Sequence, residues 1–472
     1  MKELKGIIGN KKIVTAWTFY DWANSAYSLT ITSAIFPIYF TAVTALNGTK
    51  DTMFLGHTIN ADSLQTYAIS IAFLVIAAIN PLLSSIADYS GNKKRFMYFF
   101  STLGAISCAM LYFFRGPETI GIGVFGSMFA AIGYAGSIVF YNAFLPEIAK
   151  PEDQDRVSAR GFAMGYIGSS ILLIFNLFMI QFPQYFFDVT GKMNDLLALT
   201  PTLNHDEAFK LAKESFSGQA SRISFLTVGI WWFAFAQYTF TYLPHNVFNL
   251  KPPSGKYFFN GYLELKKVWK ELRHTTRLKR FLLSFFFYNM ACQTVMYVAT
   301  LFGNSELHLD TSVLIAIILI IQFVAIGGAY LFSFLSKKFG NINALAIAIF
   351  VWMLVALGAY FDDKKFGVNE QNVFIILGAV TGLVMGGIQS LSRSTYSKLL
   401  PETIDHASFF SFYDVCDKTG TVIGTFAFGL INQVTGSMRN SILVLLAFFV
   451  IGLILLLRIP VRKKVLLGEL NS

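Results

Sequence analysis

Long apolar runs recur along the whole chain, and each is long enough to cross a membrane. A membrane-spanning helix needs about 20 consecutive, mainly apolar residues. Because the interior of a bilayer offers no water to backbone N–H and C=O groups, each run must form a helix. The pattern therefore predicts an all-α membrane protein with twelve transmembrane helices, near 23–45, 64–87, 96–114, 119–145, 158–182, 222–243, 280–302, 312–335, 342–361, 371–396, 408–434 and 439–458.

The two halves of the chain repeat short sequences in the same order. The matched pairs are LPE at 145–147 and 400–402, FYDWA at 19–23 and FYNMA at 287–291, Gly91-Asn92 and Gly340-Asn341, and Gly168 and Gly424. Parallel six-helix repeats predict a substrate site between the halves at mid-membrane. We therefore expect two pseudo-symmetric six-helix bundles, residues 1–243 and 280–472, joined by a cytoplasmic amphipathic linker at 244–279.

Two connections are longer than the rest. The linker contains the helix-breaking cluster LKPPSGK at 250–256, followed by a helical pattern with one apolar face, made of Tyr262, Leu265, Val268, Trp269 and Leu272. Lysines and Arg273 occupy the other face, which favours a helix on the cytoplasmic lipid surface over a calmodulin-type target. A second insertion, 183–221, is expected outside, with a short helix capped by Asn204 and carrying Glu207 at its third position.

Composition agrees with a membrane protein. Of the 472 residues, 54% are hydrophobic and only 14% are charged, and the mean hydropathy is +0.55. A soluble chain of this length would carry far more charge. Most of the lysines and arginines lie in segments that are cytoplasmic if both termini are cytoplasmic, as expected for a multi-pass protein of the cell (inner) membrane. The net charge of +10 then reflects topology and anionic lipid, not nucleic acid.

The first span begins with YDWANSAYSLT at 20–30, which is unusually polar for a segment that enters a membrane. At helical spacing Asp21, Asn24, Ser25 and Ser28 share one face, and a polar face should look inward. In two six-helix bundles the first, fourth, seventh and tenth spans line the central path. The side chains predicted to line a water-filled cavity there, rather than to pack between helices, are Tyr20, Asn24, Tyr27, Tyr141, Asn142, Tyr288, Asn289, Gln293, Gln389, Arg393 and Tyr396. Asn80, Asn176, Gln237 and Gln322, in other spans, are interpreted as interhelical hydrogen-bonding groups.

Charged residues inside the spans are the second candidate group. A lysine at the bilayer centre costs on the order of 2.5–3.5 kcal/mol, so such residues are expected to be paired or functional. Lys418 follows Asp414 by four residues on the same helix face, whereas Asp417 points elsewhere. Two interpretations remain open: a gate network that opens in one state, or a basic group that holds a substrate carboxylate while an acid carries protons. The coupling or gate residues are Asp21, Arg160, Asp414, Asp417 and Lys418, whose charges cancel when Arg393 is included.

The turn ADYSGNKKR at 87–95 follows the second span. Asp88 is suited to the amino end of a neighbouring helix, where the helix dipole favours negative charge. We interpret Asp88, Gly91, Lys93 and Lys94 as a conformational latch rather than a binding site.

This turn resembles the signature of the major facilitator superfamily, although Ser84 stands where that signature usually has glycine. YDWANSAY, YNAFLPEIA, DRVSARGFAMGYIGS, SRSTYSKLLPE and FFSFYDVCDKTG are more specifically similar to motifs of the vacuole-effluxer family, the fungal autophagy-related amino-acid effluxers and their bacterial homologues. The resemblance covers both halves and implies a twelve-helix secondary transporter of the bacterial type. The family often has Tyr-Asn-Asp-Gly in the seventh span, whereas this chain has Met290-Ala291 after Tyr288-Asn289, so that acid's role cannot be carried over.

The leading hypothesis is a secondary active transporter, a symporter or antiporter, for a small polar solute such as an amino acid, coupled to protons. The alternatives are a drug or hydrophobic-compound efflux pump and a non-transporting membrane sensor or scaffold. An enzyme is not expected, because the sequence has no metal-ligand pair, nucleophile elbow or phosphate loop. We expect a monomer in the lipid bilayer, with a small-molecule substrate and protons as partners and with no cofactor, metal or nucleic acid.

Overall fold

The computed structural model describes residues 6–45, 49, 51–200, 202–248, 250, 257–307, 309, 311–361 and 370–460. The first half comprises α2 (Lys11–Ala26), η1 (Tyr27–Ala34), α3 (Phe36–Thr44), β1 (Asp51–Phe54), β2 (His57–Asn60), α4 (Ala61–Ser90), α5 (Lys93–Met110), η2 (Leu111–Phe113), η3 (Pro117–Thr119), α6 (Ile120–Ala143), α7 (Leu145–Ile148), α8 (Gln154–Gln181), η4 (Pro183–Tyr185), α9 (Val189–Leu199) and α10 (His205–Tyr242). There follow α11 (Tyr257–His274), α12 (Thr276–Ser305), α13 (Thr311–Phe339), α14 (Asn341–Phe361), α15 (Glu370–Leu399), α16 (His406–Thr435) and α17 (Met438–Leu457).

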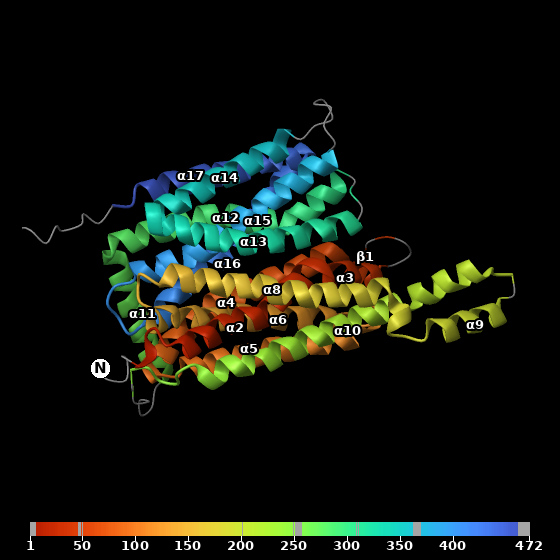
Figure 1. Cartoon of the computed structure of the whole chain (residues 1–472), viewed down its shortest axis with the longest axis horizontal. Coiled ribbons are helices and arrows are strands. Elements are labelled where there is room, and N and C mark those ends of the chain that lie inside the picture. Colours follow the sequence, from red (N-terminus) through yellow and green to blue (C-terminus); the bar gives the residue numbers. More distant parts are fainter. Residues whose placement is uncertain are drawn as a thin grey trace, which may run out of the picture.

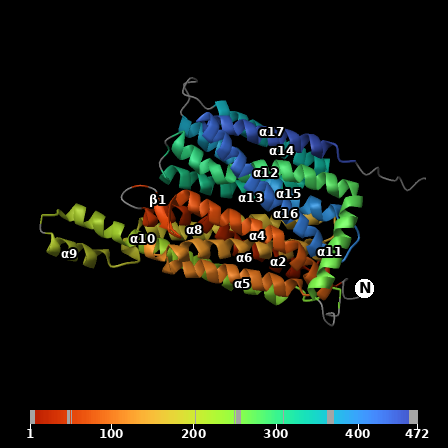
Figure 2. The same ribbon diagram turned by 180° about the vertical axis from the view of Figure 1, so that it is seen from behind.

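The helices form two bundles that lie side by side (Figure 1). Helices α2–α8 and most of α10 make the first bundle and α12–α17 make the second, as the sequence repeat predicts. Between the bundles α4 and α6 contact α16, and α8 contacts α13 and α15. Helix α11 runs crosswise over one end, called here the α11 end, while α9 and the start of α10 project from the opposite end, called the α9 end (Figure 2).

The described helices account for the predicted spans. Ten are long and apolar enough to cross a membrane, and the pair Lys11–Ala34 and Phe36–Thr44, bent by 41°, makes an eleventh. Helix α16 has 30 residues and is long enough to cross a membrane. It also carries Asp414, Asp417 and Lys418, and it is therefore not among the helices that hydropathy identifies as membrane spans. The predicted twelve spans are consistent with these eleven together with α16.

The first span differs from its prediction. Its helix begins at Lys11 rather than near residue 23, capped by Asn10, whose side chain accepts hydrogen bonds from the backbone N–H groups of Lys12 and Ile13. Asp21 therefore lies well inside the helix and not at its start. From Tyr27 to Ala34 the chain forms a π-helix, a wider turn that often marks functional sites and that the apolar pattern does not reveal.

The two long connections are also partly different. The capping box of Asn204 and Glu207 is present as predicted, but it opens the 38-residue α10 rather than a separate short helix, since no breaker stands between it and the sixth span. The linker does form a helix, α11, which buries Val268 and Leu272 and sets Gly261 against Ile86 of α4. Tyr262 and Trp269 of the same apolar face are exposed, and the placement of this helix on the lipid surface stays a prediction. Most of the cluster at 250–256 lies outside the described residues.

The internal repeat is visible in matched contacts. Gly91 and Gly340 end their helices with φ values of 68° and 83°, a left-handed conformation that glycine adopts without steric cost. Gly168 of α8 packs against Trp22 of α2, and Gly424 of α16 packs against Met290 of α12. Trp22 and Met290 hold the same position in FYDWA and FYNMA, so the same helix approach occurs in each bundle.

These glycine contacts give a stability prediction. A Cβ at Gly168 or Gly424 would meet the facing helix, so Gly168→Ala and Gly424→Ala should each lower stability by about 1–3 kcal/mol through overpacking. Gly429→Ala, in α16 with open space around its Cβ position, is the matched control and should be neutral or stabilising. The thermal unfolding midpoint of the purified protein measures this effect, and equal midpoints in all three variants would contradict it.

Candidate functional site

A cavity of about 240 Å³ lies between the two bundles, bordered by α2, η1, α4, α6, α8, α12, α13, α15 and α16. Its wall includes Ser25 and Ser28 from the polar stripe of the first span. The predicted residues that line it are Tyr27, Asn142, Tyr288, Asn289, Gln293, Gln389 and Arg393, together with Asp21, Asp417 and Lys418. The four spans predicted to line the central path, here α2 with η1, α6, α12 and α15, therefore do contribute, and α4, α8, α13 and α16 complete the wall.

Four predicted cavity residues lie elsewhere. Tyr20 and Asn24 are buried inside the first bundle, where the Tyr20 ring packs 5.0 Å from that of Tyr141. Tyr141 is itself buried and is linked to the cavity wall through Asp21 and Arg393. The Tyr396 hydroxyl donates to the carbonyl oxygen of Phe409 at 2.5 Å, one turn beyond the cavity toward the α11 end. Aromatic packing, rather than the cavity, sets the direction of these side chains.

Asp21 and Arg393 form a buried ion pair that joins the first span to the tenth. Both terminal nitrogens of Arg393 lie 3.2 Å from Oδ2 of Asp21, and the Tyr141 hydroxyl donates to the same oxygen at 2.6 Å. Arg393 also donates to the hydroxyl and carbonyl oxygens of Ser158, at 2.9 Å each. Its guanidinium carbon lies 4.1 Å from the ring centre of Phe162, a cation–π contact. The pair is thus neutralised and enclosed.

A second charged group stands on α16. Nζ of Lys418 donates to Asp417 at 2.6 Å and lies 3.9 Å from Asp414. The side-chain amides of Asn289 and Gln293 donate to the other oxygen of Asp417, at 2.6 and 2.9 Å. Asp417, which was expected to point elsewhere, is therefore the closer partner of Lys418.

Asn80 of α4 donates to Asp414 at 3.0 Å and Asn176 accepts from Thr227 at 2.9 Å, both interhelical bonds as predicted. Gln322 faces the cavity instead. Gln237 bonds the backbone of its own helix at 2.9 Å, so its predicted interhelical bond is wrong.

Arg160 does not belong to the interior charge network. Its guanidinium donates to the hydroxyl of Thr15 at 3.2 Å, within the first bundle, and it does not line the cavity. The predicted cancellation of charge is therefore wrong: the network holds three carboxylates against one arginine and one lysine, one negative charge in excess. The orientation of α8 about its axis directs the Arg160 side chain toward α2 rather than toward the cavity, and the sequence alone does not indicate this direction.

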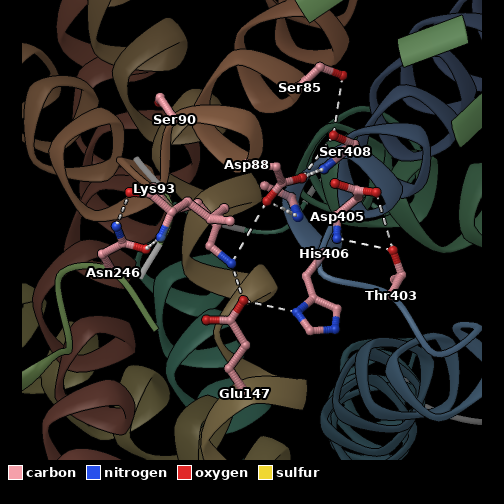
Figure 3. Close-up of polar contacts among 12 residues, drawn as sticks. Ser85, Asp88, Ser90, Lys93, Glu147, Asn246, Thr403, Asp405, His406 and Ser408 are labelled. Atoms are coloured by element: carbon pink, nitrogen blue, oxygen red, sulfur yellow. Dashed lines mark hydrogen bonds and ion pairs between the residues drawn. The ribbon is translucent and has the colours of Figure 1, made fainter. Parts of the chain in front are cut away.

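The latch residues meet the second bundle at the α11 end (Figure 3). The carboxylate of Asp88 accepts hydrogen bonds from the backbone N–H groups of Ala407 and Ser408, at 3.2 and 2.7 Å, at the amino end of α16. Lys93 and His406 both bind Glu147. Asp88 thus lies at the amino end of a neighbouring helix, as the sequence favours. Glu147 and His406 were not identified from the sequence as members of this contact.

Gly91 and Lys94 complete the described turn on the side of the first bundle. Gly91 abuts the side chain of Asn246, and Nζ of Lys94 donates to the carbonyl oxygen of Leu243 at 2.7 Å. Helix α11 approaches the same region, because Lys267 lies 3.5 Å from Asp405, the residue before α16. Burial raises the pKa of the Asp405 carboxyl and Glu264 adds to this shift, which Lys267 opposes.

A second contact between the bundles was also missed. Asp155 at the start of α8 accepts hydrogen bonds from Ser336, Asn341 and Lys398, at 2.8, 2.8 and 2.6 Å. The starts of α8 and α16 correspond in the repeat. The contact of Asp88 with the start of α16 therefore predicts a matching contact at the start of α8, and Asp155 makes it. Together the Asp88 and Asp155 contacts bind the bundles to each other at the α11 end.

Comparison with known proteins identifies similar chains. A family model described as "Vacuole effluxer Atg22 like" matches residues 9–466. The MFS-type transporter YxiO of Bacillus subtilis (strain 168) is 32% identical over 449 residues, covering 94% of each chain. Autophagy-related protein 22-2 of Neosartorya fischeri is 26% identical over 491 residues, covering 86% of this chain and 74% of that protein. The crystal structure of the human organic anion transporter MFSD10 superposes with a TM-score of 0.66 at 10% identity, over 95% of this chain and 99% of that one.

The Asp21–Arg393 pair gives a prediction for stability. Arg393→Met leaves Asp21 buried without its counter-charge and should destabilise the protein by about 3–5 kcal/mol. The double variant Asp21→Asn/Arg393→Met removes both charges and should recover much of that loss. The thermal unfolding midpoints of wild type, both single variants and the double variant provide the test. Additive losses in the double variant would contradict the pairing.

Proposed function

Because this chain belongs to the vacuole effluxer Atg22-like family and has the fold of the major facilitator transporters, we propose that it moves a small polar organic solute of the amino-acid type across the cell membrane, coupled to protons. It is a multi-pass membrane transporter rather than an enzyme. The substrate, the protons and a monomeric state are parts of the proposal.

The observation that carries the proposal is the chemistry of the cavity wall. Charges of both signs face the same small space, from Asp417, Lys418 and Arg393. Oδ1 of Asn142, a cavity residue, is buried without a hydrogen-bond partner among the described residues. A zwitterion supplies both an ammonium donor for such an oxygen and a carboxylate for the basic groups. A neutral sugar supplies neither charge.

The polar lining of the cavity, which includes Asp417, Lys418 and Gln293, argues against the drug-pump alternative. Sites for drug-sized ligands are lined predominantly by apolar and aromatic side chains. The sensor alternative needs a signalling domain. Outside the bundles, the described residues form only the α9–α10 projection, α11 and the short β1–β2 hairpin.

We propose that the α11 end faces the cytoplasm, since both α2 and the linker there are basic. Both chain termini would then be cytoplasmic, and the described state would be closed toward the cytoplasm by the Asp88 and Asp155 contacts. Alternating access requires these contacts to break as the bundles rock. The partly exposed position of Lys398, 2.6 Å from Asp155, suits a contact that forms and breaks.

An apolar cavity of about 120 Å³, lined mainly by the second bundle, adjoins the first and shares Leu29, Ser33, Met296 and Gln322 with it. Its wall includes Trp352, Ala356 and Phe428. Apolar surface removed from water stabilises a complex by about 25 cal/mol per Å². The adjoining cavity therefore favours a solute whose polar end sits among the charges and whose side chain is apolar.

The transport proposal is tested by counterflow in proteoliposomes, with the full-length protein and a panel of labelled amino acids and other small metabolites. We expect saturable uptake of at least one zwitterion. Asn142→Ala should weaken its binding about tenfold, the effect of one lost hydrogen bond of about 1.5 kcal/mol, while Asn343→Ala, at the exposed start of α14, is the matched control. Absence of saturable uptake across the panel would reject the proposal.

The apolar cavity yields a separate prediction on selectivity. Ala356→Phe fills that cavity without touching the charged wall, so transport of solutes with long apolar side chains should fall while that of glycine-sized solutes is kept. Competition between unlabelled amino acids in the same counterflow assay gives the order of preference. An unchanged order in the variant would show that this cavity does not hold the substrate.

A further inference from the structure

The interface between α4 and α16 is polar along its length. Hydrogen-bonding side chains follow each helix from the cavity to the α11 end, at intervals of three or four residues on α16 and at similar intervals on α4, where Ser84 and Ser85 are adjacent. We call this set the α4–α16 seam; it comprises Asn80, Ser84, Ser85 and Asp88 on α4, and Ser408, Ser411, Asp414 and Lys418 on α16. Its cavity end is Lys418, whose Nζ lies 5.1 Å from the ring centre of Phe73.

Side-chain hydrogen bonds join Asp88, Ser408 and Ser85 at the α11 end of the seam. Ser408 donates to Asp88 at 2.8 Å, its hydroxyl lies 3.2 Å from that of Ser85, and the Ser411 hydroxyl donates to the Ser408 carbonyl at 2.6 Å. All of these side chains are buried. The hydroxyl of Ser84 and Oδ1 of Asn80 have no partner within the described chain, although burying such a group costs about 1–3 kcal/mol.

The three interior carboxylates differ in how well they are held as anions. Asp21 accepts from Arg393 and Tyr141, and Asp417 accepts from Lys418, Asn289 and Gln293. Asp414 accepts one bond, from the amide of Asn80, and its other oxygen is 3.9 Å from Lys418, beyond hydrogen-bond distance. Asp414 is the least stabilised of the three as a carboxylate.

The chemistry beside Asp414 suits the neutral acid. A protonated carboxyl needs an acceptor, and the unpartnered amide oxygen of Asn80 belongs to the side chain that already contacts it. The charged groups nearest to Asp414 are Lys418 and Asp417, on its own helix. From α4 the polar neighbours are Asn80 and, further along, Asp88. Around the charged pair, α6 contributes Tyr134, and α12 contributes Asn289 and Gln293, which bind Asp417. One proton on Asp414 removes the excess negative charge of the network.

We propose that Asp414 binds the coupled proton and that the α4–α16 seam conducts this proton between Asp414 and the α11 end. The inference rests on the proposed transport function for its physiological meaning. A proton passes along Asp88, Ser408 and Ser85 as each hydroxyl accepts one proton and releases its own, and the last transfer, from the Ser84 hydroxyl left without a partner, forms the O–H bond of Asp414. Each serine keeps the same number of protons and its hydroxyl rotates back before the next transfer, so the proton on Asp414 is the sole species gained.

Proton binding is tested without substrate, by pH-difference infrared spectroscopy of the full-length protein in lipid nanodiscs. Wild type should show the band of a buried protonated carboxyl that disappears at high pH. Asp414→Asn should lose the band, Asp414→Glu should show a shifted one, and Asp21→Asn should keep the original. A band unchanged in Asp414→Asn, or one that sodium chloride removes at constant pH, would overturn the assignment.

The seam is tested in proteoliposomes by uptake driven by a pH gradient. Ser84→Ala should slow this uptake several-fold while keeping the infrared band. Ser170→Ala, at an equally buried and unpartnered serine of α8 that lies outside the seam, is the matched control. Equal rates in the two variants would refute conduction along the seam. Because the infrared band requires no substrate, failure of the transport proposal and failure of the Asp414 assignment give different results.

Discussion

A charge buried in a membrane protein has to be neutralised inside the protein, and here the contact between Asp21 and Arg393 does this across the two bundles. Gly161 lies directly beside the pair, where any side chain would collide with it. Trp17, Tyr141 and Phe162 enclose the guanidinium group. The pair therefore fixes how α2, α8 and α15 approach one another, and the cavity lies immediately beyond it, toward the α9 end.

Hydropathy and the internal repeat were sufficient to predict two helical bundles with an interior polar site, because both depend only on residue type and order. Side-chain direction was less predictable. On the regular helix α2, Asp21 and Ser25 border the cavity, whereas Asn24 is buried away from it. The π-helix at Tyr27–Ala34 changes the helical spacing only beyond Ala26. Arg160 and Asp417 were misplaced for the same reason: which way a polar residue points on a buried helix depends on its neighbours.

The contacts that bind the bundles were the least visible in the sequence. Glu147, Asp155, His406 and Lys398 lie at helix ends, where charged residues are common and usually face water. Each has at least one partner from the other half of the chain, so no local pattern connects them. The contact of Asp88 could be predicted because this carboxylate lies at the end of a helix beside a tight glycine turn, where it can accept hydrogen bonds from the amino end of a neighbouring helix. Asp155 lies at the start of α8, which corresponds in the repeat to the start of α16 that Asp88 contacts.

The length of α10 has a mechanical consequence. Its 38 residues extend about 57 Å at 1.5 Å per residue, nearly twice the roughly 30 Å thickness of the hydrocarbon layer. The helix is continuous from its capped start to Tyr242, so the projecting part is a rigid arm attached to the first bundle. Any tilt of that bundle is amplified at the tip of the arm, which makes the α9–α10 hairpin a natural position for a spectroscopic label that reads out bundle motion.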